Sequence, residues 1–179
     1  METNFEVRSF DADIPLEEYR AMPKAPLTIV LDNLRSAFNV GSIFRLCDTM
    51  RVSGLYLCGI TAHPPHKKLE KTSLGTIEYV PWEHFEDAVD AVRGLKERGV
   101  RVWAVETTSH ARRFDSVDYP SPLALVFGNE ALGVRKEVLD LCDGFVEIPT
   151  YGFKNSLNVA ASVAVVGYKV LEQITHWPP

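Results

Sequence analysis

Polar side chains gather in three stretches that each follow an apolar run and precede a helical pattern: residues 39–45, 128–133 and 148–158. Asn39 and Arg45 give the first stretch an amide and a permanent cation. Glu130 stands between two glycines in the second, and Ser156 and Asn158 give the third a hydroxyl and an amide. Backbone N–H groups are free where a helix begins, so such stretches suit ligands. These residue types predict a small-ligand or transferase site.

The elements that must position these residues alternate between apolar runs and helical periodicities. The apolar runs predict strands at residues 27–31, 55–58, 77–80, 100–106, 123–127 and 145–148. Helical spacing predicts helices from Asn39, as N-cap, to about Arg51, along a stripe from Phe85 to Leu95, at residues 134–141, and from Ser156 towards Glu172. This alternation is typical of an α/β fold with a mostly parallel sheet and helices on both faces. Ligands bind at the carboxyl ends of such strands, so we expect the three stretches to meet there.

The two ends of the chain differ in character. Residues 1–26 are acidic and proline-punctuated, and we interpret them as an N-terminal arm with a short helix near residues 16–22; residues 27–175 form one domain. The last helix carries apolar residues all the way round, which predicts burial on every side. In a chain of 179 residues the simplest cover is a second copy, so we expect a homodimer through this helix.

The composition limits the classes of function. The chain is 46% hydrophobic and 24% charged, with a net charge of -5, so it lacks the broad basic footprint of most nucleic-acid binders. Its three cysteines, Cys47, Cys58 and Cys142, are widely spaced and predict neither disulfides nor a zinc site. Cys47 falls on an apolar stripe and is interpreted as a core residue. No signal peptide or membrane-spanning run is present, and we expect a soluble, cytoplasmic protein.

Several familiar sites are absent from the sequence. No glycine-rich dinucleotide fingerprint follows a predicted strand, and neither a P-loop nor a nucleophile elbow occurs. His63 and His66 could share a metal, but no nearby carboxylate or thiol clearly completes the set, so no metal is predicted. The three stretches remain as the candidate site.

Their combined spacing is recognisable. The pattern is Asn39 with Arg45; Phe127-Gly-x-Glu130-x-x-Gly133; and Ile148-Pro-x-x-Gly152-x-x-x-Ser156-Leu-Asn158-Val-Ala160. It resembles the three motifs of the SpoU/TrmH family of RNA ribose 2′-O-methyltransferases, of the SPOUT class. The resemblance covers about residues 27–172 in the same order, and three spaced motifs together are far more specific than one.

The resemblance implies a fold, a cofactor and a set of site residues. The expected fold is a dimeric α/β domain with a C-terminal deep trefoil knot, and the expected cofactor is S-adenosylmethionine. The residues that would bind the cofactor are Val105, Glu106, Thr107, Gly128, Asn129, Gly133, Ile148, Ser156 and Leu157. The catalytic residues would be Arg45, Asn39, Glu130, Ser156 and Asn158. Without the resemblance, Asn39 and Ser156 could be plain helix caps and Arg45 a solvated charge.

The implied reaction is methyl transfer from the cofactor to a ribose hydroxyl of RNA, with tRNA as the first candidate and rRNA as the second. An arginine is too basic to act as a simple base, so Arg45 is expected to hold a phosphate and stabilise the forming alkoxide. The cations that could meet RNA are Arg35, Arg45, Arg51, Lys67, Lys68, Lys71, Arg112, Arg113 and Lys154. Two alternatives stay open: a knotted RNA- or cofactor-binding protein without turnover, and an enzyme for a small acidic substrate.

Overall fold

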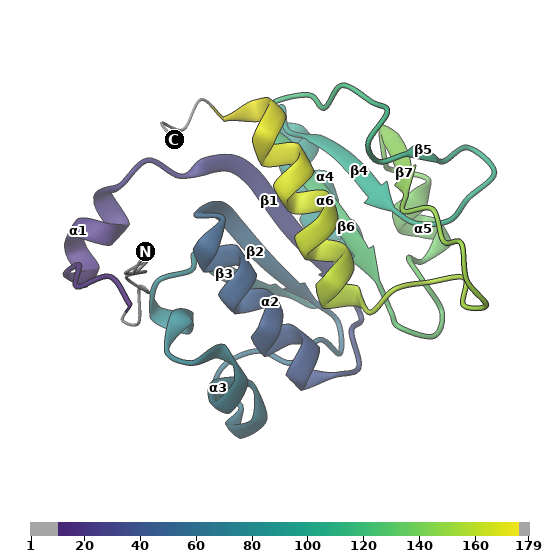
Figure 1. The fold of residues 1–179 in the computed structure, drawn as a ribbon. Coiled ribbons are helices and arrows are strands. Elements are labelled where there is room, and N and C mark those ends of the chain that lie inside the picture. Colours follow the sequence, from purple (N-terminus) through teal and green to yellow (C-terminus); the bar gives the residue numbers. More distant parts are fainter. Residues whose placement is uncertain (1–10, 176–179) are drawn as a thin grey trace, which may run out of the picture.

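The computed structural model describes residues 11–175, built around one seven-stranded parallel sheet (Figure 1). The strands lie in the order β3-β2-β1-β6-β4-β7-β5, and all neighbouring pairs are parallel. The interior strand β1 is almost fully buried, as its apolar sequence predicts. The strands are β1 (Ala25–Asp32), β2 (Val52–Cys58), β3 (Trp82–Phe85), β4 (Arg101–Val105), β5 (Arg112–Arg113), β6 (Leu123–Gly128) and β7 (Gly144–Glu147).

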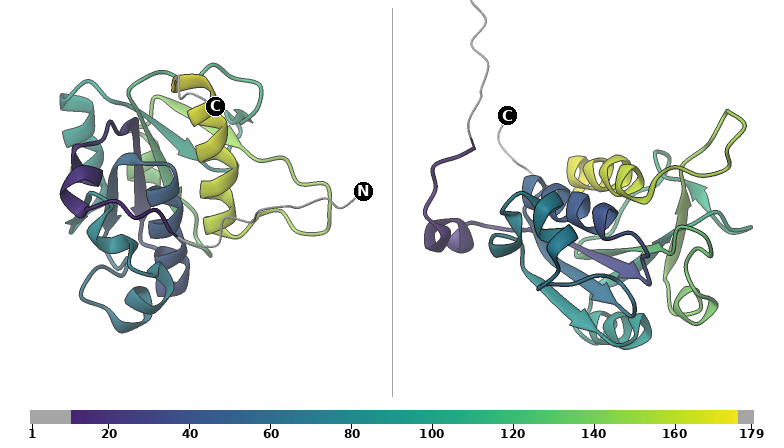
Figure 2. Two further views of the ribbon diagram at one scale, coloured as in Figure 1. Left: turned by 60° about the vertical axis from the view of Figure 1, so that its left-hand side comes forward. Right: turned by 90° about the horizontal axis from the view of Figure 1, so that it is seen from below.

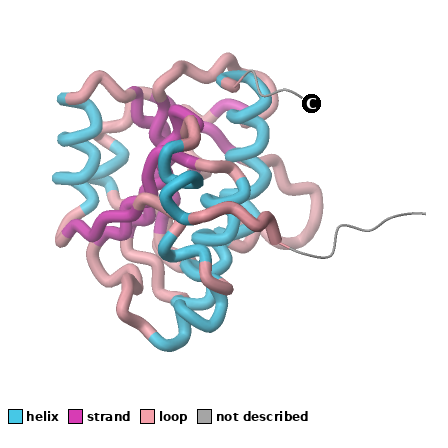
Figure 3. The backbone as a smooth tube through the Cα atoms, turned by 90° about the vertical axis from the view of Figure 1, so that its left-hand side faces the viewer, coloured by secondary structure: helices cyan, strands magenta, loops and turns pink. Residues whose placement is uncertain are grey.

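Helices cover both faces of the sheet (Figures 2 and 3). On one face α2 and α6 pack side by side over strand residues such as Ile29 and Leu125; on the other, α4 and α5 cover Val30 and Val126. Successive strand residues point to opposite faces, which explains the two cores. The helices are α1 (Leu16–Ala21), α2 (Ala37–Thr49), α3 (Lys67–Ser73), α4 (Ala88–Glu97), α5 (Lys136–Leu139) and α6 (Val159–Ile174). The predicted α/β architecture is confirmed. The trefoil knot stays a prediction, because strand order does not trace how the chain is threaded.

The strand predicted at residues 77–80 is wrong. Thr76–Glu78 form a 3-10 turn, η1, and the edge strand β3 begins only after Pro81. Gly75 turns the chain with a φ of 86°, and the N–H of Val80 bonds back to the carbonyl of Thr76 at 3.1 Å. The backbone of this segment therefore bonds locally and does not join the sheet.

The prediction that the next helix begins at Phe85 is also wrong. Phe85 is the last residue of β3 rather than the first of the following helix. Asp87 caps that helix, α4, because its carboxylate accepts the N–H of Val89 at 2.8 Å.

Residues 67–73, which lie outside every predicted strand and helix, form the helix α3. His66 caps this helix through Nδ1, which accepts the N–H of Leu69 at 3.4 Å. Leu69 is its one apolar side chain buried in the core, and the lysines stay in solvent. A lysine-rich helix with a single core residue has no apolar stripe by which sequence could reveal it.

The last helix is not buried on every side within one chain. Val163 and Val170 face the core, but Val165 and Tyr168 are 40% and 50% exposed. Gly167 allows α2 to approach closely, since a Cβ there would lie 2.6 Å from Met50 Sδ. Within one chain α6 therefore has one covered face and one open apolar face, and the cover of the open face by a second copy stays a prediction.

The N-terminal segment is fastened to the domain through α1, whose prediction is confirmed. The hydroxyl of Tyr19 donates a hydrogen bond of 2.7 Å to the carboxylate of Asp48, and its ring packs edge-on against Tyr79. Burial and this hydrogen bond raise the pKa of Tyr19. Residues 1–10 of the expected arm lie outside the described residues. Within residues 11–175, none of the helices has the length and apolar character needed to cross a membrane.

A buried carboxylate fixes the end of β1. Asp32 is fully buried and accepts the Nε–H of Arg135 at 3.0 Å and the backbone N–H of the same residue at 3.1 Å. Arg135 also donates a hydrogen bond of 2.6 Å to the carboxylate of Asp87 at the start of α4. The pair therefore ties the loop after β6 to both β1 and α4.

Arg135→Ala should destabilise the fold, because it removes the guanidinium partner of the buried Asp32 carboxylate. We expect the free energy of unfolding in urea to fall by on the order of 3 kcal/mol. The matched control is Lys136→Ala, which removes an exposed pair with Asp140 and should change the free energy of unfolding much less. Equal losses in the two variants would contradict this role of Arg135.

Candidate active site

The ends of four neighbouring strands define the site. β1, β6, β4 and β7 lie side by side and parallel, with Asp32 in register with Gly128, and Val105 with Val146. Their carboxyl ends therefore share one edge of the sheet, and each leads into one of the polar stretches or into residues 105–107. This is where ligands bind in open α/β sheets.

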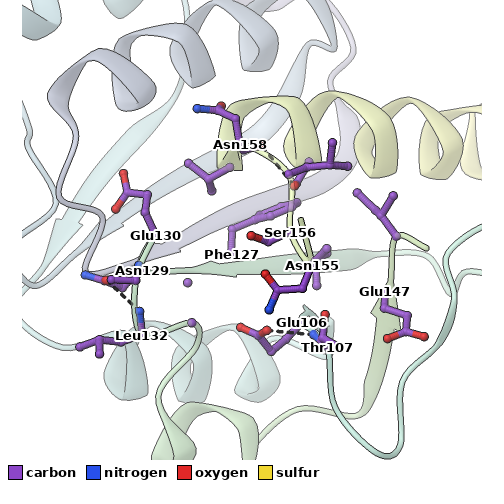
Figure 4. Close-up of a pocket in the computed structure, with 18 of the residues that line it drawn as sticks. Glu106, Thr107, Phe127, Asn129, Glu130, Leu132, Glu147, Asn155, Ser156 and Asn158 are labelled. Carbon is purple, nitrogen blue, oxygen red and sulfur yellow. Dashed lines mark hydrogen bonds between the residues drawn. The ribbon is translucent and has the colours of Figure 1, made fainter. Parts of the chain in front are cut away.

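A cleft of about 950 Å³ opens at this edge. Figure 4 shows side chains from the loops after β4, β6 and β7 surrounding it, with Asn158 at the start of α6 beside them. Its size lies within the range of about 300–1,000 Å³ that is usual for small-ligand and cofactor sites.

Glu130 joins the second stretch to the first. Its carboxylate accepts the backbone N–H groups of Arg35 and Ser36 at 2.8 and 3.1 Å and the side-chain amide of Asn39 at 3.0 Å. Ser36 is the N-cap of α2 and accepts the N–H of Asn39 at 3.3 Å, so the prediction of Asn39 as N-cap is wrong. Glu130 thus supplies from another loop the carboxylate that a capping box would place on the helix itself.

These contacts also set the charge of Glu130. Desolvation acts to raise its pKa, but the hydrogen bonds from Arg35, Asn39 and Ser36 outweigh it, so the pKa lies below the usual range. Glu130 is therefore ionised at neutral pH.

Asn158 joins the third stretch to the same group. Its Nδ2 donates to Asn39 Oδ1 at 3.1 Å, while its Oδ1 caps α6 by accepting the N–H of Ala160 at 2.9 Å. Asn158, not Ser156, is the N-cap of α6. One continuous chain of hydrogen bonds therefore runs from Glu130 through Asn39 to Asn158.

A tight turn shapes the middle of the cleft. Asn129 and Gly133 form a short antiparallel bridge, and Gly133 has a φ of 72°. A side chain at Gly128 would collide with the backbone of Gly133 and Val134. The carboxylate of Glu106 holds the turn from the neighbouring loop, because it accepts the N–H of Val134 at 2.9 Å. Both glycines are therefore required by the backbone.

The third loop has unused hydrogen-bonding capacity. Among the described residues, no backbone hydrogen bond involves residues 149–157, and residues 154–157 line the cleft. Open N–H groups at a cleft wall can bind polar atoms of a ligand.

Most of the predicted site residues line the cleft, and one of them does not. All those predicted to bind the cofactor line the cleft: Val105, Glu106, Thr107, Gly128, Asn129, Gly133, Ile148, Ser156 and Leu157. Asn39 and Asn158 line it as well, and so does Glu130. Arg45 does not; it is exposed on α2, six residues and about 9 Å along the helix axis from Asn39. Within the described chain its guanidinium has no hydrogen-bond or ion-pair partner.

The thiols do not belong to this site. Cys47 is fully buried, which raises the pKa of its thiol and confirms its interpretation as a core residue. Burial also raises the pKa of Cys58 and of Cys142 to about 12. Thiolate nucleophiles are therefore disfavoured at neutral pH.

The SpoU rRNA Methylase family matches residues 26–168. The chain belongs to the SpoU methylase family. The resemblance inferred from the three motifs is confirmed.

Relatives of this SpoU-family chain include proteins named for two classes of RNA. It is 35% identical to the tRNA (guanosine(18)-2′-O)-methyltransferase of Thermus thermophilus, over 88% of this chain and 80% of the relative. An AdoMet-bound rRNA methyltransferase from Sinorhizobium meliloti superposes with a TM-score of 0.79 at 25% identity, covering 90% of this chain and 61% of that one. A structure described as giving insight into 2-OH methylation of C/U34 on tRNA superposes with a TM-score of 0.74 at 26% identity, covering 82% of this chain and 95% of that one.

Some residues of the SpoU-family site escaped the sequence analysis. Glu147 and Asn155 line the cleft, as do Phe127 and the 85%-exposed Leu132. Lys154, expected only as a contact to RNA, lines the cleft too. Their positions within or beside the recognised motifs were the available signal. The contact of Arg135 with Asp32 had none, because it joins residues 103 positions apart.

Glu130→Gln should weaken the fold at neutral pH but not in acid. The folded pKa of Glu130 lies below its unfolded value, so its stabilising effect is present above the unfolded pKa, about 4.3, and is lost as pH falls through the folded pKa. We expect a deficit of about 0.5–1 kcal/mol at pH 7 that shrinks below pH ~4.

Urea unfolding at several pH values measures this difference. Glu83→Gln is the control, since Glu83 is an exposed glutamate with no side-chain partner within residues 11–175. A deficit for Glu130→Gln that stays constant from pH 7 to pH 3 would rule out the ionised hydrogen-bonded role.

Proposed function

We propose that this chain transfers a methyl group from S-adenosylmethionine to a ribose 2′-hydroxyl of RNA. The observation that carries the proposal is the hydrogen-bonded chain Glu130–Asn39–Asn158 beside the cleft, which brings the three family motifs together. We place the protein in the cytoplasm, because its three cysteines are free thiols, which are typical of a reducing compartment.

The cleft suits S-adenosylmethionine in size and chemistry. Its wall includes the open N–H groups of residues 154–157 and the apolar side chains of Leu132 and Leu157 for an adenine ring. Glu106 contributes a carboxylate for the cofactor's positive charges. When bound, the cofactor supplies a methyl group on a sulfonium, which is already activated for displacement. Neither a metal nor a covalent enzyme intermediate is required of the protein.

The protein's task is alignment and removal of one proton. The bound cofactor would supply the methyl group, and this chain's own residues would hold the 2′-hydroxyl in line with it and help the hydroxyl proton to leave. Arg45 stays protonated, so it acts by holding an RNA phosphate and stabilising the forming alkoxide, and the phosphate helps to accept the proton. Asn39, Glu130 and Asn158 keep the ribose side of the cleft rigid, and Ser156 orients the reacting groups.

The substrate class is proposed as tRNA. The Thermus relative and the C/U34 structure, both named for tRNA, support it. The Sinorhizobium relative is named for rRNA, which makes rRNA the second candidate.

Methyl transfer can be tested directly on unmodified RNA. Purified protein and methyl-labelled S-adenosylmethionine are incubated with tRNA and rRNA fractions from a strain lacking the gene. We expect label in the tRNA fraction, at one nucleotide whose 3′ phosphodiester becomes resistant to alkali. Label only in rRNA would change the substrate, and label in neither would overturn the function.

Arg45→Lys tests the proposed chemistry in the same assay. Lysine keeps the charge but loses the planar fork, so turnover should fall by roughly 10²-fold or more while RNA affinity changes little. Arg93→Lys on α4 is the control, because Arg93 is exposed and lies outside the residues lining the cleft. Full turnover by Arg45→Lys would remove this role from Arg45.

We propose further that two copies associate through α6. Its open face presents Ala161, Val165 and Tyr168, spaced so that they lie on one side of the helix. Contiguous exposed apolar side chains of this kind favour a protein partner, and a symmetric dimer is the commonest assembly.

Tyr168→Glu should break such a dimer, because it buries a charge at the centre of the seam. Sedimentation should give about twice the chain mass of 20.1 kDa for the wild type and the single mass for the variant. Leu74→Glu changes an exposed apolar residue that is far from α6 in the sequence, and it should leave the dimer intact. A wild-type chain that sediments as a monomer would rule out this interface.

A further inference from the structure

Two aromatic side chains stand almost fully in solvent on the loop between β7 and α6. Tyr151 is 86% exposed and Phe153 is 99% exposed. The loop projects away from the sheet (Figure 2), so neither ring belongs to a core. An aromatic side chain can bury about 150–250 Å² on a partner, which makes such exposure a sign of binding rather than folding.

The loop can adjust to a partner. Residues 149–157 make no backbone hydrogen bonds within the described chain. Gly152 separates the two rings, and nothing lies within 4 Å of the place where its Cβ would be. A segment with few internal contacts changes conformation at low cost.

The charge around the rings is positive, against the chain's net charge of -5. Residues 148–158 include one lysine and no acidic residue. Lys154 Nζ lies 5.6 Å from the centre of the Phe153 ring. Arg112 and Arg113 form β5, which pairs with β7 just before the loop; Arg113 interacts with Asp115 at 2.8 Å, whereas Arg112 lies over Trp103 with no carboxylate partner in the described chain. Exposed aromatics interleaved with cations suit single-stranded nucleic acid.

The rings also adjoin the cleft. Phe153 is followed directly by Lys154, and residues 154–158 line the cleft wall. A ribose held in the cleft would therefore have its neighbouring nucleotides within reach of this loop. A base paired inside a duplex could not stack on it, because both of its faces are already covered.

We propose that Tyr151 and Phe153 form a stacking platform for an unpaired base next to the methylated nucleotide, with Lys154 and Arg112 holding the adjoining phosphates. This inference rests on the proposed RNA methylation and narrows its substrate to a single-stranded segment, such as a loop. Stacking tolerates any base, so the platform selects for unpaired structure rather than for sequence.

The test measures binding of two fluorescein-labelled RNAs, a 12-nucleotide oligouridylate and a 12-base-pair duplex, by anisotropy without cofactor. The wild type should bind the single strand more tightly. Phe153→Ala should weaken single-strand binding on the order of 5- to 100-fold, and Phe153→Trp should retain it. Leu74→Ala, at an exposed leucine outside the loop, is the matched control and should bind as the wild type.

Salt dependence separates the rings from the cation. Phe153→Ala should leave the slope of log affinity against log salt unchanged, while Lys154→Ala should reduce it by about 0.7. Calorimetry should show unchanged S-adenosylmethionine binding for Phe153→Ala, since the ring lies outside the cleft lining.

Three outcomes would overturn the platform. These are equal binding of single strand and duplex by the wild type, wild-type affinity in Phe153→Ala, and loss of the dimer in Phe153→Ala, which would make the loop a contact between protomers. Because the assay contains no cofactor and measures no methyl transfer, its result stays separate from the test of the proposed reaction.

Discussion

The hydrogen bonds from Glu130 to Asn39 and from Asn39 to Asn158 connect segments 91 and 119 residues apart. Two of the three members also satisfy backbone N–H groups that would otherwise be left open: Glu130 those of residues 35 and 36 before α2, and Asn158 those at the start of α6. Loss of one member would therefore loosen a helix terminus as well as the site. The site and the two helices on that face of the sheet are held by the same interactions.

Rigid and adaptable parts of the cleft come from different elements. The strand ends and the Gly128–Gly133 turn are fixed by the parallel ladder, by Glu106 and by the buried Asp32–Arg135 pair. The loop after β7 has no such support. A transferase that must align two reactants benefits from a fixed wall, while a loop that admits a large polymer must be able to move. The distribution of hydrogen bonds in this chain fits both needs.

The sequence predicted most of what depends on local pattern. The apolar runs identified the buried strands, and the spacing of three polar stretches identified the residues that meet at the sheet edge. It failed where a few tertiary contacts decide the structure. Leu69 is the one apolar side chain of α3 in the core, Gly75 and Pro81 displace the edge strand, and Ser36 caps α2 in place of Asn39. The contact between Arg135 and Asp32 could not be foreseen, because no local pattern reports which distant charge a buried carboxylate will meet.

The charges inside the cleft differ from those around it, which distinguishes the place of the cofactor from that of RNA. Glu106, Glu130 and Glu147 line the cleft together with the single cation Lys154, so it favours a cationic ligand. Arg45, Arg112 and most of the other cations lie outside the lining, where the backbone of an RNA would run. S-adenosylmethionine carries a sulfonium charge that its product lacks, so the acidic wall attracts the reactant more than the product. A net charge of -5 is therefore compatible with RNA as substrate, because three carboxylates line the cleft while every cation of the described residues except Lys154 lies outside its lining.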